Sequence, residues 1–183
     1  MIGKHECKEV RGTDLKKALA VAMDEALTAL EESIHDLTDD QVRAFPIPGR
    51  NNIAWIVMHC LQGLDTYAVK FQTGQAGFEH AWRWDLWNCK PEERPKPGDP
   101  FPSKKELVDL IHRIAAAIEK ALASATEEDL KGRRQSEDWW QKSIADGCLR
   151  TVMNTAAHVR QIWLLRGALG LTDGKAWPQQ HWA

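Results

Sequence analysis

The chain has 183 residues, a formal net charge of -2 at pH 7, and 43% hydrophobic against 27% charged residues. This length favours one domain with a sizeable core, so we expect residues 1–183 to form a single domain. The near-neutral charge excludes the strong basic field that draws proteins to nucleic acid, and no apolar run is long enough to span a bilayer. We therefore expect neither nucleic acid nor a membrane as a partner.

The cysteines and the N-terminus indicate a cytoplasmic protein. The first residues contain no apolar stretch of signal-peptide length. The four cysteines are dispersed and form no C-x-x-C pair: Cys7, Cys60, Cys89 and Cys148. Dispersed cysteines are typical of reduced thiols, which the cytoplasm maintains.

The first two predicted helices follow from apolar residues that recur every three or four positions. The first runs from about residue 14 to 37, with Thr13 as its N-cap. Its stripe consists of Leu15, Leu19, Ala22, Ala26, Leu30, Ile34 and Leu37. The second runs from about residue 52 to 73, and its stripe consists of Ile53, Ile56, Cys60, Leu64, Tyr67 and Phe71.

Two further amphipathic helices complete the pattern. The third runs from about residue 104 to 125, and Ser103 with Glu106 forms a capping box at its start. His112 falls off its apolar stripe, so we expect this side chain to be exposed. The fourth runs from about residue 144 to 169 and ends at Gly170. Four separate stripes predict an all-α four-helix bundle with a core over residues 14–170.

The connections predict the order of the helices in space. Residues 75–102 form a long crossover between the second and third helices that is rich in proline and tryptophan. A long connection allows the next helix to run parallel, so we expect an up-down-down-up bundle. Seven of the nine tryptophans lie in connections or the tail: Trp82, Trp84, Trp87, Trp139, Trp140, Trp177 and Trp182. They anchor long loops against the bundle, fill a dimer interface, or wall an aromatic pocket over the open end of the bundle.

Two histidines lie on or beside the apolar faces of separate predicted helices, His59 on the second and His158 on the fourth. A bundle brings such faces together, and two imidazoles that meet in its interior form a candidate metal site. Asn154 precedes His158 by one helical turn, so its side chain can point into the same space. The neighbouring Cys60 points about 100° away from His59 on the helix and is better explained as a small buried residue.

The segments NNIAWIVMHCLQGLDTY and NTAAHVRQIWLLRGALG resemble the signatures of helices two and four in the DinB/YfiT-like superfamily. The resemblance implies an up-down-down-up bundle, a homodimer, and a divalent metal held by three histidines. Characterised relatives include metal-dependent transferases and isomerases that use low-molecular-weight thiols such as mycothiol or bacillithiol. The resemblance therefore implies a thiol or another small molecule as the ligand.

The match to the three-histidine pattern is incomplete. His59 corresponds to the helix-two ligand and His158 to the second helix-four ligand, whereas Asn154 stands where the first helix-four histidine would fall. An amide oxygen is a poorer zinc ligand than imidazole. Another residue could complete the site, and the candidates are His35, His80 and His181. If a metal binds, imidazole ligands favour Zn²⁺ or Ni²⁺ over Mg²⁺.

Three functional classes follow from these observations. The first is a metal-dependent thiol transferase, or a related hydrolase or isomerase, with a degenerate site of His59, Asn154 and His158. The second is a non-catalytic bundle that binds a small molecule or serves a stress response, in which these residues form a hydrogen-bonded polar cluster. The third is a purely structural homodimer, in which Trp163 and Leu164 form an exposed interface anchor. No residue stands out as a catalytic nucleophile.

Overall fold

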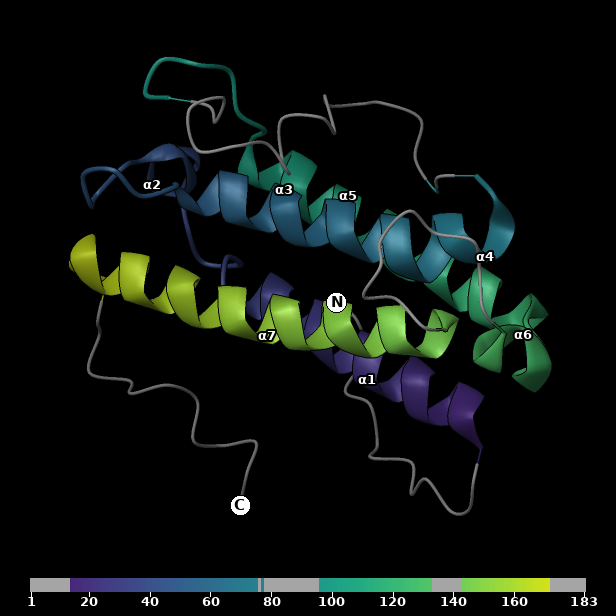
Figure 1. The fold of residues 1–183 in the computed structure, drawn as a ribbon. Helices are drawn as coiled ribbons and strands as arrows, with labels where there is room; N and C mark the ends of the chain where they lie inside the picture. Colours follow the sequence, from purple (N-terminus) through teal and green to yellow (C-terminus); the bar gives the residue numbers. More distant parts are fainter. Residues whose placement is uncertain (1–13, 76, 78–95, 133–142, 172–183) are drawn as a thin grey trace.

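The structure is a computed structural model that describes residues 14–75, 77, 96–132 and 143–171 (Figure 1), and every regular element in these ranges is helical. The elements are α1 (Leu15–Glu32), α2 (Asp39–Arg43), α3 (Ile53–Leu64), the π-helix η1 (Asp65–Lys70), α4 (Phe71–Thr73), α5 (Lys104–Ser124), α6 (Glu127–Lys131) and α7 (Ile144–Ala168). Within the described ranges, no helix is both long and apolar enough to cross a bilayer.

The four long helices form a ring in which each packs against two neighbours. α1 packs against α5 and α7, and α3 packs against the same two helices. The colours in Figure 1 show that α1 and α7 run in one direction while α3 and α5 run in the other. This arrangement is the up-down-down-up bundle that the sequence predicts. The seam between α3 and α7 is thus opposite the seam between α1 and α5.

One hydrophobic core connects all four long helices. Each contributes residues that are less than 2% exposed, among them Leu19 in α1, Leu61 in α3, Ile111 in α5 and Ile162 in α7. α3 is buried on most of its surface, since nine of its residues are buried from Ile53 to Leu64. Burial of this kind supplies most of the stability of a bundle, because helix propensity alone is marginal in water.

The ends of α1 differ from the prediction. Thr13 lies outside the described residues, and the N-cap is Asp14, whose side chain accepts a hydrogen bond from the backbone N–H of Lys17 at 3.1 Å. The helix ends at Glu32 rather than at residue 37, because the chain turns at Ser33, whose hydroxyl donates to the carbonyl of Leu30. The stripe extends further because Ile34 and Leu37 are still buried after the turn.

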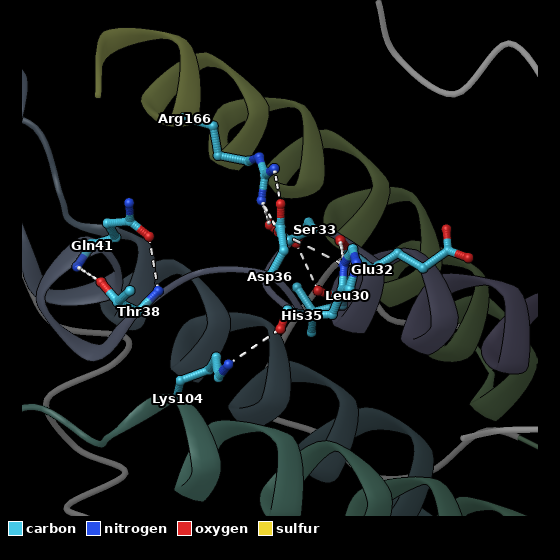
Figure 2. Close-up of polar contacts among 9 residues, drawn as sticks. All are labelled: Leu30, Glu32, Ser33, His35, Asp36, Thr38, Gln41, Lys104 and Arg166. Carbon is cyan, nitrogen blue, oxygen red and sulfur yellow. Dashed lines mark hydrogen bonds and ion pairs between the residues drawn. The ribbon is translucent and has the colours of Figure 1, made fainter. Parts of the chain in front are cut away.

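A buried arginine ties the ends of α1 and α7 together, as Figure 2 shows. The guanidinium of Arg166 binds both carboxylate oxygens of Asp36, at 2.6 and 2.8 Å, and also donates to the carbonyl of Ser33 at 3.1 Å. The indole of Trp163 lies beneath the guanidinium at 4.5 Å. Because the arginine side chain is only 5% exposed, this contact holds the pKa of Asp36 down at about 2.

The second long helix changes its hydrogen-bonding pattern part of the way along. Its α-helical part ends at Leu64, and the π-helix η1 follows without a break. The carboxylate of Asp65, 3% exposed, accepts a hydrogen bond from the backbone N–H of Gly77 at 2.6 Å. Burial raises the pKa of Asp65, and the Gly77 bond partly opposes that shift. The π-helix η1 thus begins with the buried carboxylate of Asp65, which binds the chain at Gly77, near the start of the crossover.

α5 begins at the predicted capping box, in which Ser103 and Glu106 bind each other's backbone N–H groups. His112 is half-buried, and not fully exposed as predicted. Its Nε2 lies 3.0 Å from a carboxylate oxygen of Glu31 on α1, and the side chain is 40% exposed. A histidine beside the apolar stripe of one helix can still contact the neighbouring helix, which the sequence of α5 alone does not show.

Candidate functional site

The candidate site begins with the capped N-terminus of α3. The side chain of Asn52 accepts a hydrogen bond from the backbone N–H of Trp55 at 2.8 Å and donates to the carbonyl of Arg43 at 2.9 Å. This buried cap fixes where α3 starts and joins it to α2. It thereby sets the rotation of the helix, with Trp55 and His59 one turn apart on the same face.

α7 supplies the other half of the site. Its N-cap is Ser143, and its buried face includes Thr151 and Thr155. Asn154 and His158 are four residues apart, so they lie one turn apart on the same side of α7. Thr155 is buried beside them, which puts both residues at the edge of the buried face. The edge borders α3, which packs directly against α7. Asn154 is exposed and His158 is half-buried, so the cluster lies at the mouth of the seam.

The two imidazoles meet across this seam. The ring centroids of His59 and His158 are 4.8 Å apart, with an interplanar angle of 79°. The amide nitrogen of Asn154 lies 3.5 Å from Nε2 of His59. On its other side, the His59 ring stacks on the indole of Trp55, with centroids 5.1 Å apart and an interplanar angle of 7°. The structure therefore brings together the three residues that the sequence selects.

Gln161 completes the surroundings of His158. Its Oε1 lies 3.0 Å from Nδ1 of His158, one turn further along α7. Burial lowers the pKa of His158, and the hydrogen bond that the Gln161 oxygen accepts partly offsets that shift. The apolar periodicity of the sequence pointed to neither Trp55 nor Gln161 as a residue of the site. The available signal was their spacing, because residues three and four apart on a helix are neighbours.

The two described cysteines are not nucleophiles. Burial raises the pKa of both Cys60 and Cys148 to about 12, so their thiols stay protonated near neutral pH. The Cys60 thiol also forms a hydrogen bond with Thr155, inside the α3–α7 seam. Cys60 is the small buried residue that its helix position predicts.

None of the other described histidines joins the site. His35 is exposed at the end of α1, where its Nδ1 contacts the carbonyl of Glu32 at 2.8 Å. His112 contacts Glu31 across the α1–α5 seam, on the opposite side of the bundle. His80 and His181 lie outside the described residues, as do the seven tryptophans of the connections and tail. Their predicted roles stay predictions.

The donor atoms fit a divalent metal ion only in part. Two imidazoles from different helices are suitable ligands for Zn²⁺ or Ni²⁺, whereas the atom of Asn154 that faces His59 is its amide nitrogen, which donates hydrogen bonds and does not bind metal ions. Within residues 14–75, 77, 96–132 and 143–171, no group of three His, Cys, Asp or Glu side chains converges. The cluster thus brings together two imidazoles and the side-chain amide of Asn154 at one seam of the bundle.

The structure thus combines an up-down-down-up bundle with a histidine pair on its α3–α7 seam. The model of the DinB superfamily matches residues 22–162 of this chain. The chain therefore belongs to the DinB superfamily, as the resemblance of its sequence predicts.

Two solved structures share the fold. A conserved protein from Enterococcus faecalis superposes with a TM-score of 0.64 at 16% identity, covering 87% of this chain and 99% of that one. YfiT from Bacillus subtilis superposes with a TM-score of 0.62 at 15% identity, covering 93% of this chain and 97% of that one. YfiT is described as a probable metal-dependent hydrolase with an unusual four-helix bundle topology. No curated protein matches the chain.

Proposed function

We propose that this protein is a metal-dependent enzyme acting on small molecules, of the thiol-transferase type or a related hydrolase or isomerase. His59 and His158 are the metal ligands, and Asn154 is a weak ligand or an orienting group. The observation that supports this assignment is the meeting of two imidazoles from different helices, with centroids 4.8 Å apart at a half-buried seam.

The chemistry of the donors sets the identity of the ion. Imidazole nitrogen favours Zn²⁺ or Ni²⁺, whereas Mg²⁺ prefers oxygen ligands. Such an ion, when bound, lowers the pKa of a coordinated water or thiol. His59 and His158 would hold such an ion. Trp55 stacks on the His59 ring and limits its rotation, and the amide nitrogen of Asn154 lies beside Nε2 of His59. The description of YfiT as a probable metal-dependent hydrolase supports the same class of chemistry.

An activity screen tests this proposal. The full-length protein is freed of metal, loaded with Zn²⁺, Ni²⁺ or Mg²⁺, and incubated with mycothiol, bacillithiol or glutathione and an electrophilic acceptor; ester substrates test hydrolysis. We expect turnover with Zn²⁺ or Ni²⁺, none with Mg²⁺, and none in His158→Ala. His35→Ala is the matched control, because His35 is exposed at the end of α1, away from the α3–α7 seam. Equal turnover without metal, or in His158→Ala, would contradict the proposal.

A second candidate function is non-catalytic binding of a small molecule. It is favoured by the contact between the Asn154 amide and Nε2 of His59, which already gives that nitrogen a hydrogen-bond donor. In this case the cluster recognises a polar ligand through its own hydrogen bonds. Absence of metal binding, together with saturable binding of a small molecule that His59→Ala removes, would support this alternative.

The proposed assembly is a homodimer in the cytoplasm, with small molecules rather than nucleic acid or membranes as partners. The outer face of α7 exposes Leu149, Met153 and Leu164, at 47%, 73% and 65%. Apolar side chains grouped on one face are typical of an interface. Trp163 was expected to be exposed beside Leu164, but it is half-buried under Arg166, so Leu164 is the better anchor. A purely structural dimer is the third class, and it requires no ligand at the histidines.

A further inference from the structure

The hydrogen bond between Gln161 and His158 determines which nitrogen of the imidazole carries hydrogen. Gln161 presents its amide oxygen, Oε1, to Nδ1 of His158 at 3.0 Å. An amide oxygen only accepts hydrogen bonds, so Nδ1 must donate. A neutral imidazole has one N–H, and Nε2 of His158 therefore keeps its lone pair.

The orientation of the His59 ring and the acceptor role of its Nε2 depend on other residues. Its Nε2 faces the amide nitrogen of Asn154 at 3.5 Å, and an amide nitrogen only donates. The Nε2 atom of His59 is thus an acceptor as well. Stacking on Trp55, with the planes 7° apart, opposes rotation of this ring. His158 has no stacked partner among the ring contacts of the described chain, so its hydrogen bond to Gln161 carries the corresponding role.

From these contacts we infer that Gln161 is a positioning residue, which holds His158 as the Nδ1–H tautomer and leaves Nε2 as the atom that binds the ligand. The inference rests on the proposed function for the identity of that ligand, a divalent metal ion. Metal-binding histidines usually donate their second ring N–H to an acceptor, and loss of that acceptor typically weakens metal binding about 10- to 100-fold. Gln161 is exposed and lies on the helix surface, so its substitution leaves the core intact.

The tautomer can be measured without any metal. In long-range ¹H–¹⁵N NMR spectra of the metal-free, full-length protein at pH 8, we expect His158 to carry its hydrogen on Nδ1. Gln161→Met keeps the length of the side chain but has no oxygen, so His158 should shift to the Nε2–H form that free imidazole side chains favour. Gln161→Glu keeps an acceptor and should retain Nδ1–H. Arg160→Met, at the neighbouring exposed position, is the matched control and should leave the tautomer unchanged.

The second measurement is Zn²⁺ affinity by titration calorimetry on the same proteins. We expect Gln161→Met to weaken binding at least about tenfold, and Gln161→Glu to match or exceed wild type. An Nδ1–H form that persists in Gln161→Met would overturn the inference, whatever the metal does. Equal Zn²⁺ affinity in wild type and Gln161→Met would overturn it too. If the tautomer shifts as expected but wild type binds no metal, Gln161 still sets the tautomer of His158, and it is the proposed function that fails.

Discussion

The imidazole of His158 meets that of His59 edge to face, with ring centroids 4.8 Å apart and planes at 79°. The residues are far apart in sequence and come from helices that run in opposite directions. Two imidazoles held this close can share one ligand, because the nitrogen ligands of one metal each lie about 2 Å from it. Trp55, Asn154 and Gln161 each fix part of this geometry.

Asn154→His should strengthen metal binding, because it adds a third imidazole at the position where an amide now contacts His59. We expect Zn²⁺ and Ni²⁺ affinities to rise by at least about tenfold, measured by titration calorimetry, since three protein ligands are usual for catalytic zinc.

Met153→His is the matched control for that substitution. It adds the same side chain one position earlier on α7, at a site that is 73% exposed and points away from the seam. Affinity that rises equally in both variants would mean that any added surface imidazole suffices. Unchanged affinity in Asn154→His would place the ion elsewhere.

The four long helices could be predicted because each buries a stripe with a regular spacing. The same spacing misled at the end of α1, where Ile34 and Leu37 are buried although the helix stops at Glu32. The turn there is fixed partly by Arg166, which is 133 residues from Ser33 in sequence. A contact between residues so far apart leaves no periodic pattern in the sequence near Ser33, so the end of the helix could not be predicted from it.

The candidate site could be predicted in part for a similar reason. His59 and His158 were found because a polar residue beside an apolar stripe stands out. The stacking of Trp55 on His59 was missed because tryptophan at a buried helix position fits an ordinary core residue. The π-helix η1 was missed because an i→i+5 turn depends on packing and not on a characteristic sequence.

Removal of the Asp36 carboxylate should make stability depend less on pH. The pKa of Asp36 is lowered from 3.8 to about 2 in the folded protein, so its stabilising effect is present above pH 4 and is lost as the pH falls toward 2. Asp36→Asn should therefore lower the free energy of unfolding at pH 6, and this difference should shrink by pH 3 in urea titrations. Asp109→Asn, in the exposed pair with Lys105, is the control and should have little effect. A difference that stays constant from pH 6 to 3 would contradict the role of the Arg166 contact.

Two glycine substitutions should change stability in opposite directions. A Cβ at Gly77 would lie 2.8 Å from a carboxylate oxygen of Asp65 and 3.0 Å from Cβ of Ala117, so Gly77→Ala should destabilise the fold by about 1–3 kcal/mol. A Cβ at Gly63 meets only Oγ1 of Thr151, at 3.5 Å, so Gly63→Ala should stabilise α3 by roughly 0.5–1 kcal/mol. Thermal and urea unfolding measure both. A Gly77→Ala variant as stable as wild type would contradict the close packing of Gly77 against Asp65 and Ala117.

Leu164→Glu should shift the proposed homodimer toward monomer, because it places a charge where a 65% exposed leucine would be buried at the interface. Sedimentation velocity at micromolar concentration measures the change. Ala116→Glu adds the same charge at an exposed position on α5 and should leave assembly unchanged. A wild-type protein that is already monomeric would refute the dimer.

Titration of the metal-free, full-length protein with Zn²⁺ and Ni²⁺ tests the central assignment most directly. Wild type should bind one ion per chain, and both His59→Ala and His158→Ala should abolish that binding while their circular dichroism spectra remain helical. Binding that survives both substitutions, or its absence in wild type, would contradict a metal site at the α3–α7 seam.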